Sequence, residues 1–561
     1  MRYYLLTIFF LYASIINSQN SGDYPLEIPI ILSGTFGELR PNHFHAGIDI
    51  KTNAESGLKV YSINDGYVYR IKISPWGYGK AIYIKHPDGY TSVYAHLSRY
   101  NLSIEKYVKK HQYEKESYTL DLFPLKNEIS INKGDLIAFS GNTGSSSAPH
   151  LHFEIRKSRN QFPQNVLNFG FDIYDDIAPT IKEIKISPYG KNSQVNFSDK
   201  PKIYTAKKIN KNYLIKDTIP VYGKISTGIH TYDLLNGAKN KNGVYSVELK
   251  IDNKTIYFHE MNEFSFNETK YINSHIDYAE KKLNKKNIHS CYLQENNNLS
   301  IYKIFEDKGI FKVDSVHFGE FIVKDLHSNI SKIKFIYKSV NKAKTKAKKI
   351  IKFKKITFPY NKENIFKNEN VEVKIPKMAL YDTLIFKYHK SLDTLKNCFS
   401  PIHKIHNNKT PLHKPYYISI KNSVPENLRN KAFICEVSKN GNLIYKGGTW
   451  NNRKLSTEIR NFGDFTVSID TTPPIITPLN IEEGKTMKSS SIRINIEDKL
   501  SGIKSYRGEI NGSWILMEYD PKRNRLTHFF EKKLKKGKHI FKLIIVDNKE
   551  NTSKYEVNFK L

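Results

Sequence analysis

Short segments of alternating hydrophobic and polar residues, separated by glycines, recur from residue 24 to about residue 173. Residues 66–73 (GYVYRIKI) and 80–85 (KAIYIK) are examples, and Gly77 and Gly79 lie between them. Alternation with a period of two, rich in aromatic and β-branched residues, is typical of antiparallel strands, and glycines suit the turns between them. We therefore expect this region to form a small domain built on an antiparallel β-sheet.

Two later parts of the chain share residues in the same order. The matching pairs are 176–181 with 470–475, 227–229 with 501–503, and 325–332 with 547–554. Three ordered matches predict two copies of one β module, of which the first carries a long insertion. The second copy, with residues 541–547 (FKLIIVD) as a late strand, resembles the immunoglobulin-like sandwich modules of secreted bacterial proteins.

The length of 561 residues predicts about three to four folding units. We expect a mainly β protein in which the small antiparallel domain is followed by two or three β-sandwich-like modules. The expected boundaries are 1–18 for a leader, 19–175 for the first domain, 176–340 for a β-sandwich-like module with an insertion, 341–370 for a Lys-rich linker, 371–469 for a β-rich module and 470–561 for an immunoglobulin-like β module.

The N-terminus has the pattern of a secretory signal peptide. Met1 and Arg2 precede an apolar run over residues 3–16, and polar residues follow from Asn17. We expect cleavage after Ser18; an uncleaved anchor is the alternative. No later apolar stretch is long enough for a membrane helix, so the sequence predicts no stable membrane span after cleavage. The protein is expected to be exported, to the periplasm or to the extracellular cell envelope.

The chain is strongly basic. It has 88 Lys and Arg against 55 Asp and Glu, which gives a formal net charge of +33. Such an excess suits a nucleic acid, an anionic surface or wall polymer, or a protein that is simply rich in lysine. Because the leader indicates export, we do not expect nucleic acid as a partner. Residues 342–349 (KAKTKAKK) are either a solvated linker or a contact for an acidic polymer.

Cysteine is too rare to organise the fold or a metal cluster. The chain has three, Cys291, Cys398 and Cys435, so one disulfide at most can form, and Cys398 and Cys435 are the nearer pair in sequence. Nothing in the sequence predicts an oligomeric state.

Five residues in three short patterns of the first domain are candidates for metal binding or catalysis. His45 and Asp49 are separated by three residues, His150 and His152 by one, and His96 ends a strand-like segment. On extended backbone, the members of each pair project from one face. Each pattern alone could be a surface ion pair or a strand residue without function. Together, two histidines and one aspartate make a three-ligand zinc site with an open fourth position, the arrangement that catalytic zinc uses.

These patterns belong to a longer series of motifs. The series comprises residues 32–49 (LSGTFGELRPNHFHAGID), Gly66, 94–97 (YAHL), 141–144 (GNTG) and 149–154 (PHLHFE). In this order and combination it resembles the M23 family of zinc metallopeptidases, of the lysostaphin and LytM type. The resemblance covers roughly residues 24–175, less than a third of the chain.

The resemblance implies roles for the five residues. His45, Asp49 and His152 would hold zinc, and His96 and His150 would be catalytic. Zinc lowers the pKa of a bound water and polarises a carbonyl, and a neighbouring histidine can accept a proton or hold an oxyanion. The implied activity is hydrolysis of peptide bonds in peptidoglycan stem peptides or cross-links. The alternative is a non-enzymatic M23-like protein that binds the wall as a regulator or scaffold.

Some residues depart from the family pattern or lie close to it. Ala148 stands where family members commonly have glycine, and it is expected to touch no ligand. The polar stretch 101–131 is expected to form a loop or short helix on the rim of the groove, where it would shape substrate choice. We expect His43 to face solvent and His86 to be a loop residue. Glu154 could orient a ligand histidine, but a strand residue that meets solvent is the favoured interpretation.

Overall fold

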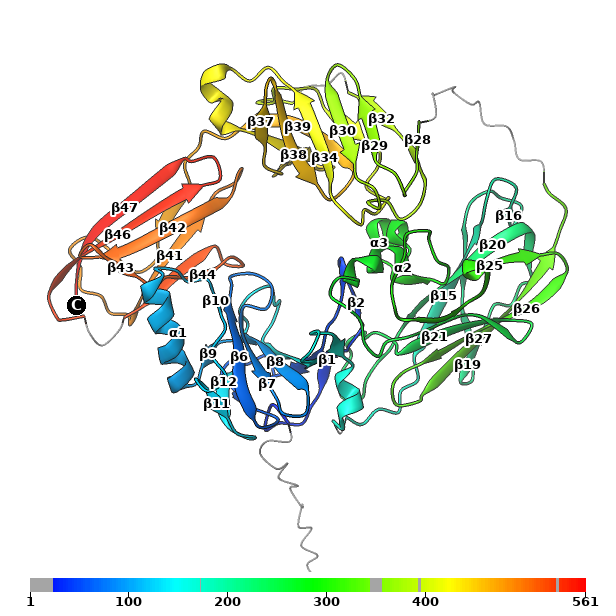
Figure 1. Cartoon of the computed structure of the whole chain (residues 1–561), viewed down its shortest axis with the longest axis horizontal. Helices are drawn as coiled ribbons and strands as arrows, with labels where there is room; N and C mark the ends of the chain where they lie inside the picture. Colours follow the sequence, from blue (N-terminus) through cyan, green and yellow to red (C-terminus); the bar gives the residue numbers. More distant parts are fainter. Residues whose placement is uncertain (1–23, 172, 344–355, 392–394, 531–533) are drawn as a thin grey trace, which may run out of the picture.

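The computed structural model describes residues 24–171, 173–343, 356–391, 395–530 and 534–561. Within these ranges the chain is mainly β, as predicted, and four β-rich units each enclose a hydrophobic core. Figure 1 shows the units following one another around a closed circuit, so that the fourth unit returns to the first. The predicted leader 1–18 lies outside the described residues, as does most of the Lys-rich run at 342–349.

The first unit is built on a nine-stranded antiparallel sheet. Its central path runs β1 (Leu32–Gly34), β4 (Ile48–Lys51), β13 (His150–Lys157), β8 (Tyr90–Leu97), β7 (Lys80–Lys85), β6 (Gly66–Ile73) and β10 (Leu120–Leu122). One face of this sheet packs on a core that includes Val68, Ile82 and Phe153, all fully buried. The alternation in the sequence is therefore an alternation between this core and the opposite face of the sheet.

The stretch 101–131 forms a helix and two short strands. Helix α1 (Leu102–Glu114) begins after Asn101, whose side chain accepts a hydrogen bond from the Ile104 amide. Beside it lies a three-stranded sheet of β5 (Lys59–Tyr61), β12 (Leu136–Phe139) and β9 (Arg99–Tyr100). The predicted helix is present, but it contacts the fourth unit: the rings of Tyr113 and Trp514 meet edge to face at 5.2 Å.

The second unit contains a thirteen-stranded sheet. Its main strands are β15 (Thr180–Pro188), β20 (Ile219–Tyr232), β27 (Ile330–Ser339), β26 (Val316–Lys324), β21 (Ser246–Ile251), β22 (Lys254–Glu260) and β24 (Tyr302–Phe305). The segment between β22 and β24 includes α2 (Ile272–His275), α3 (Tyr278–Asn284) and β23 (Ile288–Ser290). This segment contacts the first unit through a shared hydrophobic cluster that contains Phe44, Phe264 and Ile272.

The third and fourth units are each made of paired sheets around one core. In the third, one sheet contains β29 (Asn364–Lys367), β30 (Val371–Ile375), β34 (Tyr416–Lys421), β38 (Lys454–Ile459) and β37 (Thr449–Asn451); the other contains β32 (Tyr388–Lys390), β33 (His403–Ile405), β39 (Gly463–Ile469), β35 (Ala432–Val437) and β36 (Leu443–Tyr445). The unit already begins with β28 (Ile356–Phe358), inside the range that the sequence assigns to a linker.

In the fourth unit, two four-stranded sheets share the core. One contains β40 (Ile475–Pro478), β41 (Ser491–Glu497), β45 (Arg525–Phe529) and β44 (Glu518–Asp520); the other contains β43 (Ser513–Ile515), β42 (Ile503–Ile510), β46 (Lys538–Asp547) and β47 (Thr552–Lys560). Antiparallel sheets packed face to face make a sandwich of the predicted kind. Cys291, Cys398 and Cys435 are all free thiols.

The internal repeat is visible in the second and fourth units, but in a different register. The Asn329 side chain donates to the Asp175 carbonyl over 3.0 Å, and the Asn551 side chain donates to the Asp470 carbonyl over 3.0 Å. Asp175, and not Asp176, is therefore the counterpart of Asp470. The third predicted match is in place, because the hairpins β26–β27 and β46–β47 occupy equivalent positions.

The middle match of the repeat is wrong. Gly228 lies inside the long strand β20, where it pairs with Ser290, whereas Gly502 lies in the turn before β42. The residues that correspond between the two units in this region are two aspartates, Asp233 and Asp498. Asp233 directly follows β20, and Asp498 directly follows β41, the equivalent strand of the fourth unit. A three-residue similarity around one glycine carried too little information to distinguish a strand from a turn.

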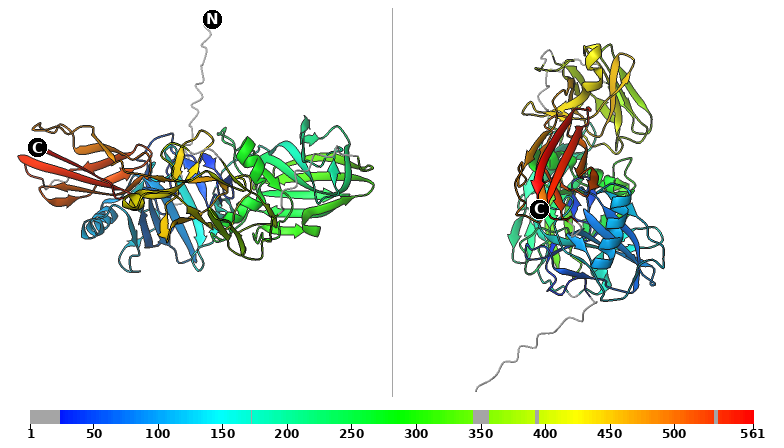
Figure 2. Two further views of the ribbon diagram at one scale, coloured as in Figure 1. Left: turned by 90° about the horizontal axis from the view of Figure 1, so that it is seen from above. Right: turned by 90° about the vertical axis from the view of Figure 1, so that its left-hand side faces the viewer.

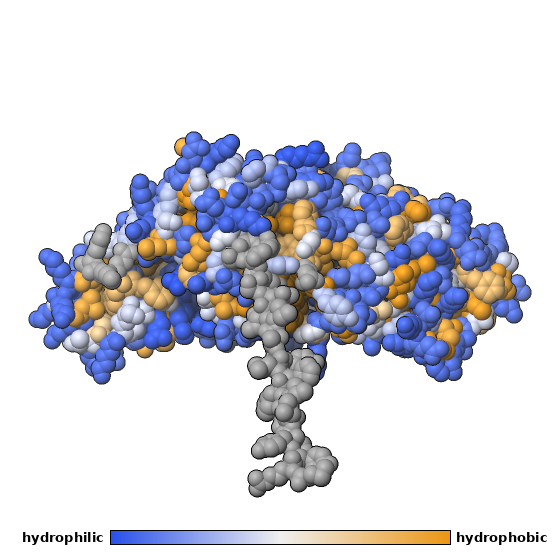
Figure 3. Space-filling model, turned by 90° about the horizontal axis from the view of Figure 1, so that it is seen from below, coloured by the Kyte–Doolittle hydropathy of each residue, from blue (hydrophilic) through white to orange (hydrophobic). Residues whose placement is uncertain are grey.

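The circuit closes through contacts between the fourth and first units (Figure 2). Besides the Tyr113–Trp514 ring contact, Lys80 forms an ion pair of 2.9 Å with Glu518 on β44. Hydrophilic residues predominate on the face drawn in Figure 3, and hydrophobic residues form separate groups there. Within the described ranges, no helix has both the length and the hydrophobicity to cross a membrane.

Candidate active site

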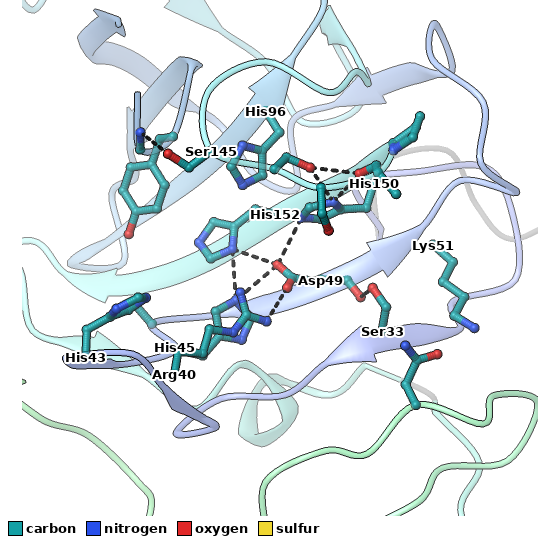
Figure 4. Close-up of a pocket in the computed structure, with 18 of the residues that line it drawn as sticks. Ser33, Arg40, His43, His45, Asp49, Lys51, His96, Ser145, His150 and His152 are labelled. Atoms are coloured by element: carbon teal, nitrogen blue, oxygen red, sulfur yellow. Dashed lines mark hydrogen bonds and ion pairs between the residues drawn. The ribbon is translucent and has the colours of Figure 1, made fainter. Parts of the chain in front are cut away.

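Three neighbouring strands of the first unit bring the predicted site residues together. Asp49 lies on β4, directly opposite His152 on β13, and His96 is the penultimate residue of the next strand, β8. His150 precedes His152 by two positions on β13, and His45 lies in the segment just before β4. Figure 4 shows all five side chains gathered around one cavity. The structure thus brings together every site residue that the sequence predicts.

His45, Asp49 and His152 form a compact buried group. His45 Nε2 lies 3.0 Å from Asp49 Oδ1, His152 Nδ1 lies 2.8 Å from the same oxygen, and the two nitrogens lie 3.0 Å apart. The three residues are 2%, 4% and 3% exposed, respectively. Two imidazole nitrogens and one carboxylate oxygen are a donor set that zinc accepts in a tetrahedral site with one open position.

The hydrogen bonds around this group leave lone pairs that can bind a cation. His45 Nδ1 donates to the Thr35 carbonyl over 2.8 Å, and His152 Nε2 donates to Glu154 Oε1 over 2.7 Å. In neutral imidazoles, the remaining nitrogens, His45 Nε2 and His152 Nδ1, then carry lone pairs. Both lone pairs face Asp49 Oδ1, which is itself an acceptor. A metal ion among these atoms would satisfy all three, so the residues present fit zinc.

The pKa of His152 shows the same attraction for positive charge. Burial lowers it, but hydrogen bonds to Asp49 and Glu154 outweigh burial and raise the pKa to about 9. The pKa of Asp49 lies well below its usual value: burial would raise it, but His45, His150 and His152 stabilise the ionised form. Either a proton or a metal ion can compensate the negative charge of the Asp49 and Glu154 carboxylates.

Glu154 supports the group from behind, which corrects the favoured interpretation from sequence. It is fully buried rather than solvent-facing, and it receives hydrogen bonds from His152, from Arg156 Nε over 2.6 Å and from the Tyr78 hydroxyl. Burial raises the pKa of Glu154, but Arg156 and His152 lower it to about 2, so the carboxylate is ionised at neutral pH. Glu154 therefore fixes the tautomer and the orientation of His152.

Arg40 performs the corresponding task for Asp49, and sequence analysis assigned it no role. Its Nη2 donates to Asp49 Oδ2 over 2.5 Å and lies 3.3 Å from Glu38 Oε2. The close approach needs Gly34, because a Cβ there would lie 2.4 Å from Arg40 Nη2. Gly34 and Arg40 both belong to the motif of residues 32–49. The sequence therefore contained them, but it did not show that Arg40 contacts Asp49.

His96 and His150 lie side by side next to the proposed ligands. Their ring centroids are 4.8 Å apart, and each Nδ1 donates to a backbone carbonyl, of Thr143 and Ala148 respectively. Both rings therefore present Nε2 as an acceptor when neutral. His150 Nε2 is buried, has no hydrogen-bond partner among the described residues, and lies 3.4 Å from Asp49 Oδ1.

The environment keeps His96 in its neutral form. Burial, together with His152 and His150, lowers its pKa to about 3. His96 also has a left-handed backbone conformation, with φ of 59°, which a non-glycine residue adopts only when the surrounding structure holds it. Ala148 contributes its carbonyl to His150, so the loop before β13 orients a predicted catalytic side chain through its backbone.

The group opens into a cavity of about 900 Å³. The first unit lines most of it, and Asn240, Phe266 and Thr269 of the second unit form one side. His43 also lines it; it is exposed, as predicted. His86 is buried away from the cavity between Asp65 and Ser92, and so supports a turn.

Comparison with known proteins agrees with this geometry. Residues 43–114 and 116–165, which carry all five site residues, match the family described as Peptidase family M23. The first unit is an M23 domain. Residues 355–470, which form the third unit, match a family described as Zu5-like domain.

Curated proteins with a similar sequence match about a quarter of the chain or less. "DD-carboxypeptidase/endopeptidase Mpg" of Neisseria meningitidis serogroup B is 31% identical over 146 residues, which cover 25% of this chain and 27% of that protein. Lysostaphin of Staphylococcus simulans is 32% identical over 111 residues, 20% of this chain and 17% of lysostaphin. The chain thus spans about a quarter or less of the length of these relatives.

Among solved structures, the catalytic domain of lysostaphin from Staphylococcus simulans is similar to the M23 domain. The match has 24% sequence identity and a TM-score of 0.19, and it covers 25% of this chain and 91% of that structure.

Proposed function

We propose that the chain is a zinc-dependent endopeptidase that hydrolyses peptide bonds in the stem peptides or cross-links of peptidoglycan. One observation carries the proposal: His45, Asp49 and His152 direct three donor atoms at one another inside a cavity, with His96 and His150 beside them. A zinc-binding protein with only a structural role would have no need of the two extra histidines beside an open fourth position.

In the proposed mechanism, His45 Nε2, Asp49 Oδ1 and His152 Nδ1 hold the metal. Bound zinc would supply a water of lowered pKa and polarise the scissile carbonyl. When the rings are neutral, Nε2 of His96 and of His150 is an acceptor, so either ring could accept the proton of the water. The ring that holds this proton becomes an Nε2–H donor and would then stabilise the developing oxyanion. The backbone carbonyls of Thr143 and Ala148 keep both rings in the required tautomer.

Two observations support peptidoglycan as the substrate. The relatives of the M23 domain include lysostaphin and a protein named as a DD-carboxypeptidase/endopeptidase. The net charge of +33 would favour adsorption to an anionic wall, an effect that salt screens over about 8 Å at physiological ionic strength. We accordingly place the protein outside the cytoplasm, in the periplasm or at the cell envelope, after removal of residues 1–18.

Hydrolysis of purified sacculi tests the proposal. The zinc-loaded chain should release soluble muropeptides, whose masses identify the bond cleaved, and chelation or His152→Ala should abolish release. His389→Ala, a change of an exposed histidine in the third unit, should leave release intact. Intact sacculi after prolonged incubation with a chain that contains zinc would overturn the proposal and favour the non-enzymatic, wall-binding alternative.

A further inference from the structure

A second group of histidines is buried in the second unit. His259 lies on β22, His275 ends α2 and His289 lies on β23, and the three are 0%, 0% and 4% exposed. One ring nitrogen of each lies within 4.8 Å of one ring nitrogen of the others. We propose that His259, His275 and His289 form a second metal site, for zinc or a similar divalent transition metal, distinct from the M23 site.

The geometry of this group repeats that of the M23 ligands. His275 Nε2 lies 3.0 Å from His289 Nδ1, and in the M23 site His45 Nε2 lies 3.0 Å from His152 Nδ1. The ring of His259 packs against both members of the new pair, with centroids 4.9 Å from His275 and 5.5 Å from His289. Three imidazoles from three separate elements therefore converge on one point.

Tyrosine hydroxyls hold the outer nitrogens of two of these rings. Tyr257 Oη lies 3.0 Å from His259 Nδ1, and Tyr302 Oη lies 3.1 Å from His275 Nδ1. With the hydrogen on Nδ1, each histidine donates to its tyrosine, and Nε2 presents a lone pair. Metal-bound histidines are commonly held in this way by a partner on the other ring nitrogen.

His259 provides the observation that separates a metal site from an ordinary polar cluster. Its Nε2 is buried and has no hydrogen-bond partner among the described residues. A hydrogen bond between His275 and His289 would satisfy those two rings but would leave His259 Nε2 unsatisfied, and a buried unsatisfied acceptor is costly. A metal ion would satisfy all three nitrogens at once.

The chemistry of the group selects the class of metal. All three members are buried histidines, and the group of ligand atoms contains no carboxylate. Neutral imidazole suits zinc, copper, nickel or iron, whereas calcium and magnesium need oxygen ligands. We therefore take zinc as the occupant to be tested.

The site lies where the second unit meets the M23 domain. The ring of Phe44, the residue before His45, packs edge to face on His275 at 5.7 Å, and the Phe44 amide donates to Thr269 Oγ1 over 2.9 Å. A metal bound to His275 would stiffen α2 and the surface on which Phe44 rests. With three protein ligands, the metal would keep a fourth position for water. The inferred role is to hold the two units together, and this role does not depend on the proposed peptidase activity.

The metal content of the purified full-length chain tests the inference. After loading with Zn²⁺ and removal of weakly bound metal on a chelating resin, the wild-type chain should hold two zinc ions, and His275→Gln and His152→Ala should hold one each. His403→Gln is the matched control, because His403 is also buried with an unpartnered Nε2 but is not in a histidine group; it should hold two. Equal zinc in His275→Gln and the wild-type chain would overturn the inference.

The same measurement separates this inference from the proposed function. One zinc that is lost in His152→Ala but kept in His275→Gln would support the M23 site alone and overturn the second site. One zinc with the opposite pattern would support the second site and contradict the zinc peptidase. His275→Gln could fail to fold, so Tyr302→Phe provides a milder variant that removes only the hydroxyl.

Cobalt gives a readout of the ligands themselves. Co²⁺ added to the His152→Ala chain should produce visible d–d bands and an X-ray absorption spectrum with the multiple-scattering signature of imidazole rings and no sulfur ligand. In that background, Tyr302→Phe should weaken Co²⁺ binding by about 10- to 100-fold, because His275 loses the partner that orients it. Absence of a cobalt spectrum from the folded His152→Ala chain would overturn the inference.

Discussion

The Arg40 guanidinium donates to Asp49 Oδ2 over 2.5 Å, while the other oxygen, Oδ1, faces His45 and His152. One carboxylate is therefore shared between an orienting cation and the proposed metal ligands. Arg40 is partly exposed, with 29% of its side chain accessible, whereas only 6% of the Asp49 side chain is. The guanidinium thus fixes the direction of Asp49 from the edge of the cavity.

This contact predicts that Arg40→Met weakens zinc binding without unfolding the chain. Methionine keeps the aliphatic length but removes the donor, so Asp49 can rotate, and we expect about a 10- to 100-fold loss of zinc affinity with a similar loss of hydrolysis. Competition with a chromophoric chelator measures the affinity. Arg99→Met, which changes an exposed arginine elsewhere in the domain, is the control. Unchanged zinc affinity in Arg40→Met would show that Asp49 is held by other contacts.

Glu154→Gln tests the support behind His152. Glutamine keeps the shape but loses the negative charge. The His152 Nε2–H and the Tyr78 hydroxyl then donate to a weaker acceptor, and the new NH2 group faces the Arg156 Nε–H donor. We expect a loss of zinc affinity of about 10- to 100-fold, larger than the loss of thermal stability would explain. Zinc titration and melting curves with and without metal give the two quantities. A variant that melts earlier but binds zinc as tightly as the wild-type chain would make Glu154 purely structural.

Much of the fold and site could be predicted because their signals are local. Alternation over a few residues identified the strands, and pairs such as His45 with Asp49 are close enough in sequence for extended backbone to place them together. Arg40 could not be given a role in this way, and an orienting role for Glu154 was only the less favoured interpretation. Their importance depends on which strand lies next to β4 or β13 and on what covers the sheet, and neither is encoded in short spacing.

The same limit explains the errors in the repeat and in the stretch 101–131. Asp175 and Asp176 are adjacent and identical in type, and only the hydrogen bond from Asn329 identifies the equivalent of Asp470. The polar stretch was expected on the rim of the groove, but none of residues 101–131 lines the cavity. Its helix contacts Trp514, a partner about 400 residues away that no local pattern reveals.

The contact between the fourth unit and the M23 domain predicts an effect on catalysis. Lys522 Nζ donates to the carbonyls of Asn142 and Ser146, and the Ser146 hydroxyl lies 3.1 Å from His150 Nδ1. Lys522→Ala should loosen this loop, lower kcat several-fold and increase amide hydrogen exchange at residues 141–149 while zinc content stays constant. Lys536→Ala, in the same unit, is the control. Normal kcat in Lys522→Ala would mean that the fourth unit does not influence the loop.

The second unit contains a buried acidic group whose charge predicts a pH-dependent stability. Burial, together with Asp325 and Asp175, raises the pKa of Asp233 to about 8. In the unfolded chain an aspartate titrates near pH 4. Between these values the folded chain binds more protons than the unfolded chain, so the free energy of unfolding decreases as pH rises from about 4 to about 8 and levels off above that range.

Asp233→Asn should remove the part of this dependence that Asp233 contributes, because asparagine resembles the protonated acid and carries no charge. The part that comes from Asp175, whose pKa burial raises to about 6, should remain. We expect the variant to melt at a higher temperature than the wild-type chain at pH 8, and the two to converge near pH 4. Melting curves across this range measure the effect, with Asp176→Asn as the control, since Asp176 is exposed and adjacent to Asp175 in sequence. A wild-type melting temperature that does not fall relative to Asp233→Asn would show that the three carboxylates are compensated by positive charge at neutral pH.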